Sequence, residues 1–348
     1  MGDGITPALR FPEFRGAPPW QVKRLGEVVE FAKGKGIAKA DVTENGKTPC
    51  IRYGEIYTVY REHITDVQSR TNLDPKQLVL SQARDVIIPA SGEDPLDMAR
   101  ACCVESSGIA LGGDINILRG APDGVFLAYF LNSAGRKEIA RYAQGYSVVH
   151  LYASHLRNLK IPLPSLAEQR EIVGCLSSLD DLIEAREGQV SALKLHKRGL
   201  MQRLFPAPGE ATPALRFPEF RDAPPWQVKR LGEVASVATG ASNREDSEEE
   251  GDYAFFDRSN DRRRSSRFIF DCEAIIVAGE GKEFSPRYFC GKFDLHQRAY
   301  AITEFGENSG LFLYFWIERN RHHFLRFSVG STVPSLRMAT FTSFPLLL

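Results

Sequence analysis

The sequence predicts an α+β protein in which two related domains are joined by one long helix. Three observations lead to this fold class: a segment near the start recurs almost unchanged, runs typical of strands and helices follow each copy, and a heptad pattern lies between the copies. The 348 residues are enough for two or three domains that each bury a core. With 43% apolar and 25% charged residues, the composition excludes collagen-like, disordered and small disulfide-stapled classes.

The charge balance argues against a protein that coats nucleic acid indiscriminately. Lysine plus arginine number 44, as do aspartate plus glutamate, so any DNA binding must come from local patches. The six cysteines contain no C-x-x-C pattern and indicate reduced thiols. Residues 1–14 lack the apolar core of an export signal, and no run approaches the ~20 residues of a membrane span. We therefore expect a cytoplasmic protein that does not bind membranes.

An internal repeat defines the domain organisation. Residues 6–28 read TPALRFPEFRGAPPWQVKRLGEV, and residues 212–234 differ from them only by Asp222 in place of Gly16. The spacing of 206 residues (212 − 6) is far longer than the ~20–50 residues of a solenoid unit. The repeat therefore marks the N-terminal segment, here called the entrance segment, of a domain-sized module that occurs twice.

Behind these entrances the two copies diverge in sequence but keep a similar outline. Residues 84–89 and 271–277 each predict a buried strand after a turn, and residues 125–131 and 311–317 each predict the start of a helix. Two copies of one scaffold in the same role would explain this outline. Near-identical borders around divergent interiors favour instead one scaffold that presents two different binding surfaces.

The segment between the copies predicts a long helix over residues 165–205. Ser165 and Glu168 form a capping-box pattern after Pro164, and Pro206 ends the helical pattern. Seam positions recur at alternating steps of four and three, and all are apolar except Arg186 and Lys197. This heptad period favours a coiled coil over a core helix of one domain. About 39 residues at ~1.5 Å each make a rigid spacer of about 58 Å. The seam that we expect to face a partner helix comprises Ile172, Leu176, Leu179, Ile183, Val190, Leu193 and Leu200.

Three parts of the sequence together resemble one family. They are Trp20 with LGEV at 25–28, the IPLPSLAEQREI sequence at 161–172, and Trp226 with LGEV at 231–234. In these residues the chain resembles the specificity (S) subunits of type I restriction-modification systems, which serve in bacterial defence.

The resemblance implies an architecture and a function. It implies two target-recognition domains, residues 1–164 and 206–348, around a conserved coiled-coil spacer helix, residues 165–205. Each domain is expected to read half of a split site in double-stranded DNA. The subunit is expected to dock methyltransferase (modification) subunits and restriction or motor subunits. S-adenosylmethionine, ATP and Mg²⁺ are then expected on those partners, with no cofactor in this chain.

One feature departs from the family pattern. Specificity subunits normally carry a second conserved helix after the second recognition domain, and here residues 344–348 stand where it should begin. The resemblance therefore implies that the second domain is truncated or that another chain supplies this helix. We expect exposed seam residues at Leu176, Leu179, Ile183 and Leu193, and hence self-association or folding with a partner.

Motifs for catalysis or metal binding are weak. A phosphate-loop pattern at residues 46–48 fails because Asp41 stands where glycine is needed, and the adenine-methyltransferase tetrapeptide is absent. Asp271, Glu280 and Lys282 mimic the acid–acid–lysine set of metal-dependent nucleases, although turn residues after a strand explain them equally well. The cysteines and histidines lack zinc-ligand spacing. We therefore expect a non-catalytic chain without a metal site.

Candidate DNA-binding residues are cationic, amide and aromatic side chains at predicted scaffold tips. Residues 262–267 form the densest cationic stretch, and a solvated loop offset by the acidic run at 245–252 is an equally weighted alternative. The candidates are Lys33, Lys35, Arg52, Tyr53, Arg100 and Tyr146 in the first module, and Asn243, Arg258, Asn260, Arg262, Arg263, Arg264, Lys282 and Arg287 in the second.

The function that we expect is recognition of a bipartite DNA site. The spacer length exceeds one turn of B-DNA, about 34 Å, so two modules joined by it could meet grooves about a turn apart. The alternative is a protein-binding adaptor that associates through the heptad helix without reading DNA.

Overall fold

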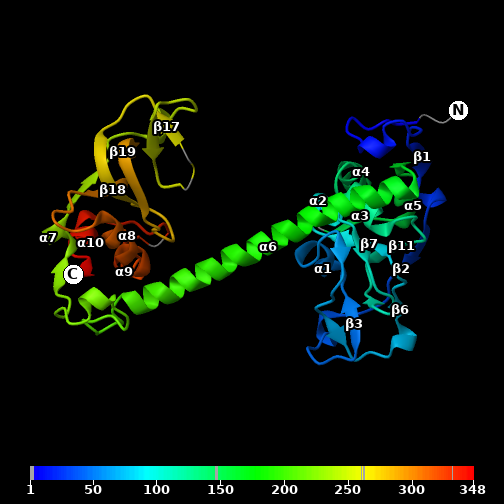
Figure 1. The fold of residues 1–348 in the computed structure, drawn as a ribbon, viewed down its shortest axis with the longest axis horizontal. Coiled ribbons are helices and arrows are strands. Elements are labelled where there is room, and N and C mark those ends of the chain that lie inside the picture. Colours follow the sequence, from blue (N-terminus) through cyan, green and yellow to red (C-terminus); the bar gives the residue numbers. More distant parts are fainter. Residues whose placement is uncertain (1–3, 146–147, 260, 262, 331) are drawn as a thin grey trace. The chain divides into compact units, whose positions relative to one another are not determined.

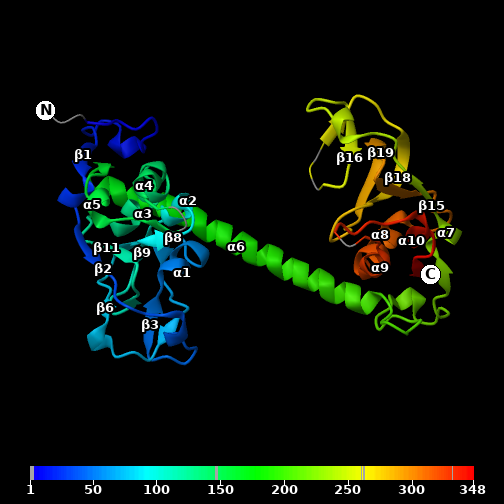
Figure 2. The ribbon, with the colours of Figure 1, turned by 180° about the vertical axis from the view of Figure 1, so that it is seen from behind.

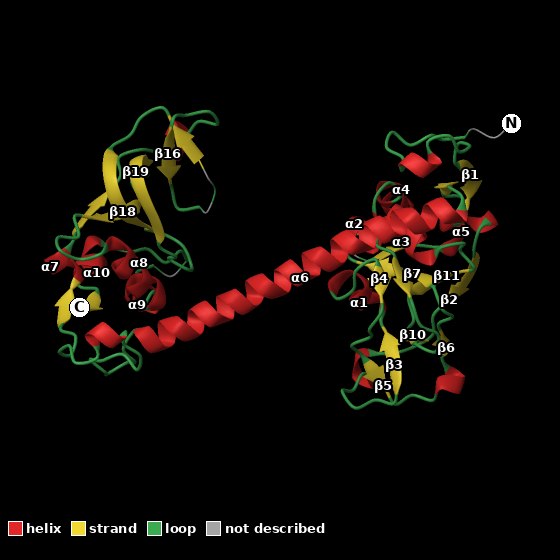
Figure 3. Ribbon diagram, viewed as in Figure 1, coloured by secondary structure: helices red, strands yellow, loops and turns green. Residues whose placement is uncertain are grey.

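The computed structural model describes residues 4–145, 148–259, 261, 263–330 and 332–348. Its contacts divide the chain into two compact units, Met1–Glu187 and Gly188–Leu348 (Figure 1). Each unit combines short helices with sheets of mostly antiparallel strands (Figure 3). The predicted α+β fold class is therefore confirmed.

The first unit is built around a five-stranded sheet with strand order β2-β11-β7-β9-β4. Alternate residues of β7 enter separate apolar clusters. Val86 packs with Val125 of helix α3 (Gly124–Asn132), whereas Ile87 packs with Ile117. Burial of both sheet faces accounts for the continuous apolar run that predicted this strand. The strands are β2 (Glu30–Lys33), β4 (His63–Ile64), β7 (Asp85–Pro89), β9 (Cys102–Val104) and β11 (Ile115–Arg119).

Smaller elements complete the first unit. A four-stranded sheet, two strand pairs and short helices surround the central sheet. The strands are β3 (Thr48–Ile51), β5 (Arg70–Thr71), β6 (Val79–Leu80) and β10 (Ala110–Leu111) in the smaller sheet, and β8 (Ser91–Gly92) with β12 (Val149–His150) and β1 (Gln21–Arg24) with β13 (Lys160–Leu163) in the pairs. The helices are α1 (Tyr53–Thr58), α2 (Pro95–Met98), α3 (Gly124–Asn132), α4 (Arg136–Tyr142) and α5 (Ala153–Leu156).

The second unit contains a six-stranded sheet with order β15-β20-β18-β19-β16-β17. Helices gather on one side of this sheet (Figure 3), where Leu313 and Ile317 of α8 pack on Ile275 and Val277 of β18. The strands are β14 (Val228–Arg230), β15 (Ser236–Thr239), β16 (Tyr253–Phe256), β17 (Arg263–Ser265), β18 (Phe270–Ala278), β19 (Arg287–Leu295), β20 (Ala299–Thr303) and β21 (Pro345–Leu347). The helices are α7 (Leu231–Val234), α8 (Gly310–Arg319), α9 (His322–Phe327) and α10 (Met338–Thr342).

The long helix α6 (Leu166–Leu204) has 39 residues and confirms the predicted spacer helix. Its first turns lie beside α3 in the first unit (Figure 2), where the Tyr129 hydroxyl donates to Asp180 Oδ2 at 2.5 Å. The predicted capping box is only half formed. Ser165 Oγ accepts from the Glu168 amide at 3.3 Å, but the Glu168 carboxylate turns to Arg10 instead of back to the helix start.

The two repeated segments fold alike. Each contains a 3-10 turn, Pro12–Phe14 in the first and Pro218–Phe220 in the second. Each continues into a strand that pairs antiparallel with the last strand of its unit, β1 with β13 and β14 with β21. The repeated sequence therefore builds the same entrance in both units.

No helix in the part of the chain that the structure describes is both long enough and apolar enough to cross a bilayer.

Candidate nucleic-acid interface

Four of the predicted DNA-binding residues in the first unit come from segments that meet at the turn after β10. The Lys35 amide donates to the Leu111 carbonyl at 3.0 Å, and the Gly112 amide donates to the Ile51 carbonyl at 2.9 Å. These main-chain bonds bring together the two segments that carry Lys33, Lys35, Arg52 and Tyr53.

These four side chains differ in exposure. Lys33 and Lys35 are exposed, and Lys33 Nζ lies 3.9 Å from Asp114 Oδ1. Arg52 and Tyr53 are half-buried at the start of α1. The two lysines are thus flexible point charges suited to phosphates, whereas Arg52 and Tyr53 are held closer to the scaffold.

Arg100 faces into the first unit. Its Nη2 donates to the Tyr60 carbonyl at 3.1 Å, and its Nε is buried without a hydrogen-bond partner among the described residues. Arg100 is half-buried, and this hydrogen bond ties its guanidinium group to the main chain at Tyr60. Tyr146 lies outside the described residues.

In the second unit, a polar cavity of about 450 Å³ lies where loops join the strands of the sheet. Its walls come from the 3-10 turn Arg244–Asp246, the residues after β16, and the turn between β19 and β20. The cavity contains two of the predicted residues, Asn243 and Arg258, and brings together Asn243, Arg244, Glu245, Asp257, Arg258, His296, Gln297 and Arg298.

The turn between β19 and β20 supplies polar groups with defined orientations. The Arg298 amide donates to Nδ1 of His296 at 3.0 Å, which leaves Nε2 to carry the proton of the neutral ring. Burial lowers the pKa of His296, so this ring is neutral at physiological pH. Gln297 Nε2 donates to Asn243 Oδ1 at 2.6 Å, which places two exposed amides side by side. Neutral donors and amides of this kind suit hydrogen bonding to base edges.

Two arginines at the cavity share one carboxylate. Arg258 Nη1 lies 3.3 Å from Oε2 of Glu280, and Arg298 Nη1 lies 2.7 Å from Oε1 of the same residue. The side chains of both arginines are more than half exposed, at 55% and 59%. Glu280 therefore orients two cations that remain accessible to an anionic ligand.

The cationic stretch after β16 is tied to the acidic segment that precedes it. Arg264 donates to the carbonyls of Gly251 and Asp252. Arg267 Nη2 lies 3.2 Å from Oδ2 of Asp246, and Arg263 Nη1 donates to Ser247 Oγ at 3.2 Å. Of these contacts, only the Arg267–Asp246 pair joins an arginine to a carboxylate of the acidic run, and Arg263–Ser265 form strand β17 rather than a solvated loop.

The Arg287 side chain stabilises the main chain of the cavity wall. Its Nη1 and Nη2 donate to the carbonyls of Ser259 and Asp257 at 3.0 and 2.6 Å, and its guanidinium lies over the Phe256 ring. Burial alone would raise the pKa of Asp257, but hydrogen bonds from Ser259 and the nearby Arg263 outweigh it and leave that pKa below its ordinary value. Asp257 is thus a buried anion that stabilises the turn after β16.

Six of the eight residues that line the cavity were not among the candidates, and four of these six are basic or amide side chains. Arg244, His296, Gln297 and Arg298 were not among the candidates, although an H-Q-R turn between two apolar strands is a polar signal at a strand junction. Lys282 is exposed in the loop after β18. Asn260 and Arg262 lie outside the described residues.

The nuclease pattern does not form a site. Asp271 lies at the start of β18 and Glu280 lies beyond its other end, which separates their main chains by about 30 Å at ~3.3 Å per residue. Glu280 is instead paired with arginines. The described residues contain no cluster of three or more potential metal ligands. The hypothesis of a nuclease centred on Asp271, Glu280 and Lys282 is therefore wrong.

The heptad seam of α6 is largely open to solvent. Every residue from 181 to 198 is exposed, including Ile183, Val190 and Leu193. Leu179 is exposed as expected, but Leu176 is half-buried because it lines a hollow beside the entrance segment of the first unit. Ile172 and Leu200 are also half-buried.

Comparisons with known proteins identify relatives of one kind. A specificity subunit of the type I restriction enzyme MjaVIII from Methanocaldococcus jannaschii is 25% identical over 238 residues, covering 67% of this chain and 52% of the relative. The specificity subunit of the type I restriction enzyme EcoDI from Escherichia coli is 30% identical over 117 residues, covering 34% of this chain and 26% of the relative. The chain thus spans about half, or less, of the length of these relatives.

A solved structure shares the fold. The crystal structure of a type I restriction-modification system S subunit from M. genitalium aligns with a TM-score of 0.70 and 16% identity, covering 99% of this chain and 88% of that one. The family described as type I restriction modification DNA specificity domain matches residues 18–195 and 224–348, which is most of the sequence. The chain therefore belongs to the type I restriction modification DNA specificity domain family.

Proposed function

We propose that this chain is the DNA sequence-recognition subunit of a type I restriction-modification complex and reads a bipartite site in double-stranded DNA. One observation carries the proposal beyond family membership. The two units are entered through nearly identical segments, yet they contain sheets of different strand number and order. Different surfaces on matching entrances suit the reading of two different half-sites.

The proposed division is a recognition domain at residues 1–164, a spacer helix at 165–205 and a second recognition domain at 206–348. In the first domain, the exposed Lys33 and Lys35 support a phosphate contact at the turn after β10. In the second, the polar cavity with Arg258 and Arg298 supports contacts to both phosphates and base edges. The other candidates on these loops are proposed as secondary contacts.

The proposed partners follow from this role. The chain would dock methyltransferase and restriction or motor subunits, which would hold S-adenosylmethionine, ATP and Mg²⁺, and it would perform no chemistry itself. The exposed seam of α6, with Leu179, Ile183, Val190 and Leu193, supports self-association or pairing with a partner helix. A cytoplasmic location fits a complex that acts on chromosomal or invading DNA.

The decisive experiment is a methylome. The chain would be co-expressed with its neighbouring methyltransferase subunit in a host that lacks adenine methylation, and methylated adenines would be sequenced. A new split motif that requires this chain is expected. If both proteins are soluble and associated but no motif appears, the recognition function is wrong and the adaptor alternative takes its place.

A further inference from the structure

The turn between β19 and β20 is held by main-chain hydrogen bonds to two other segments. The Gln297 amide donates to the Ser242 carbonyl at 2.9 Å, and the His296 amide donates to the Phe256 carbonyl at 2.9 Å. The Ala299 amide closes the turn by donating to the His296 carbonyl at 2.9 Å. The side chains of residues 296 and 297 therefore extend from a fixed main chain, which is what a recognition site requires.

A buried carboxylate stabilises the same part of the second unit. Asp294 is fully buried, and its two oxygens accept from Ser242 Oγ at 2.7 and 2.8 Å. Ser265 Oγ of β17 also donates to Asp294 at 3.1 Å, and Arg267 Nε lies 3.4 Å from it. A buried charge is tolerated only when it is paired and hydrogen-bonded, so these contacts hold Ser242 against β19. The next residue, Asn243, thereby lies beside the turn and lines the same cavity.

One hydrogen bond sets the direction of the Gln297 side chain. Its Nε2 donates to Asn243 Oδ1 at 2.6 Å, and the main-chain amide of Asn243 donates to Asp246 Oδ2 at 2.7 Å. Because both carboxamides are exposed, water could replace the bond between them at little cost in stability, and its main effect is to orient Gln297. Among the described residues, the Gln297 side chain makes no other hydrogen bond, which leaves Oε1 and the second Nε2 hydrogen available.

The free edge of the Gln297 carboxamide matches adenine among the four bases. It offers an acceptor and a donor side by side, and adenine offers the complementary N6–H donor and N7 acceptor in the major groove. Guanine presents two acceptors there, and cytosine and thymine each present one hydrogen-bonding group. The neutral His296 ring adds an Nε2–H donor from the same turn, which suits the O4 acceptor of the thymine paired with that adenine.

The cations of the cavity suit phosphates better than bases. Arginine reads guanine when two nitrogens on one edge are free to form a bidentate contact. In Arg258 and Arg298, Nη1 lies 3.3 and 2.7 Å from the carboxylate of Glu280. Both side chains can still attract a phosphate, since that contact depends on charge more than on a particular edge. Discrimination between bases in this cavity is then left to Gln297 and His296.

We propose that Gln297 is a specificity-determining residue that reads an adenine in the major groove, and that Asn243 is its positioning residue. The half-site that the second unit reads would then contain an A·T pair opposite this turn. The inference rests on the proposed function, because it names one base pair of the site that the chain recognises.

The test compares methylomes of the full chain and its variants, each co-expressed with the methyltransferase subunit in a host that lacks adenine methylation. In Gln297→Ala, one A·T position of the wild-type motif should become degenerate while the other positions keep their base. A bidentate base contact supplies about 5- to 150-fold discrimination, so methylation of sites with another base at that position should rise by this factor relative to the motif. Gln297→Glu keeps an acceptor but no donor and should shift the preference at that position to cytosine.

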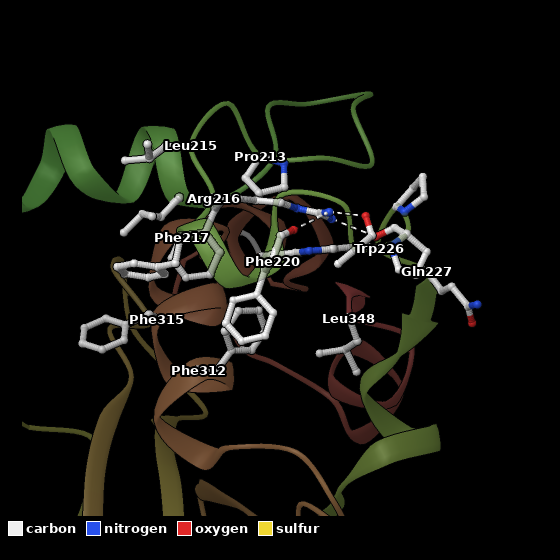
Figure 4. A pocket seen from close by; sticks show the side chains of 15 residues that line it. Pro213, Leu215, Arg216, Phe217, Phe220, Trp226, Gln227, Phe312, Phe315 and Leu348 are labelled. Atoms are coloured by element: carbon white, nitrogen blue, oxygen red, sulfur yellow. Dashed lines mark hydrogen bonds between the residues drawn. The ribbon is translucent and has the colours of Figure 1, made fainter.

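Two further variants test the positioning role of Asn243. Asn243→Ala should relax the same position more weakly than Gln297→Ala, whereas Asn243→Asp keeps an acceptor for Gln297 Nε2 and should retain the base preference. A merely structural role would instead lower methylation at all sites equally. The matched control is Gln227→Ala, which should leave the motif unchanged. Gln227 is an exposed glutamine of the same unit that lies at a separate, mainly apolar groove (Figure 4).

The outcomes separate this inference from the proposed function. If the wild-type chain produces no motif, both are wrong. If the wild-type chain produces a motif and Gln297→Ala keeps every A·T position of it, the proposed function holds and the inference is overturned. A uniform loss of methylation in Gln297→Ala, or relaxation at a G·C position, also overturns the inference.

Discussion

The strongest prediction about DNA binding concerns Arg258 and Arg298, which share Glu280 at the polar cavity. Each phosphate contact contributes about 0.9 to the slope of log K against log salt, so the double variant Arg258→Ala/Arg298→Ala should reduce that slope by about 1.8. Relative to about 1 M salt, where the counterion effect vanishes, a slope change of about 1.8 corresponds at ~0.15 M salt to a loss of affinity of up to about thirtyfold. Because Glu280 neutralises part of this charge, we expect a loss between about fivefold and thirtyfold.

The assay is anisotropy of a labelled duplex that carries the methylome motif, titrated with the methyltransferase-bound complex across a salt series. Glu280→Gln gives an opposite control, since removal of the shared carboxylate should strengthen binding and steepen the slope. Arg221→Ala, an exposed cation outside the cavity, should change neither. If the double variant keeps the wild-type slope, the cavity does not contact phosphates and its assignment as an interface is wrong.

Three other predictions follow from burial and charge. Cys175 and Cys290 are exposed, whereas burial raises the pKa of Cys102 to about 12. A thiol reagent at pH 8 should therefore label only the exposed thiols until the chain unfolds, which peptide mass spectrometry can measure. Leu193→Glu should reduce any self-association in sedimentation velocity while leaving the melting temperature unchanged, because this seam residue is exposed. Asp257→Asn should cost about 1–2 kcal/mol of unfolding free energy at pH 7. Because the folded-state pKa of Asp257 lies below its ordinary value, this difference should persist above the unfolded-state pKa and vanish as the pH falls through the folded-state value.

The architecture was predictable because its signals are local and repeated. The apolar run at β7 and the heptad pattern of α6 each arise from neighbours within one element, and the structure contains both. The internal repeat supplied the long-range information that a single sequence usually lacks. The capping box was predicted only in part, since the Glu168 carboxylate is used by Arg10, a residue 158 positions away.

The candidate site was harder to predict because sequence does not show which way an arginine points. Arg100 and Arg287 were plausible ligands for DNA as isolated cations, yet both donate to main-chain carbonyls inside their units. Arg298 and His296 were overlooked because the turn that presents them becomes a cavity wall only when the residues after β16 and before β17 fold against it. Such tertiary arrangements carry no periodic signal.

Contacts of the entrance segment explain why nearly all of its residues are identical in the two copies, whereas the interiors of the two units differ. Leu25 and Leu231 are fully buried, and their amides donate to the Leu159 and Phe344 carbonyls at 2.8 and 2.9 Å. Glu27 and Glu233 each accept from the main chain three residues earlier. Arg10 and its equivalent Arg216 donate to the same carbonyl positions, Ala17 and Pro18 in the first copy and Ala223 and Pro224 in the second. These residues form the same local contacts in both copies, so the segment can stay constant while the sheets behind it diverge.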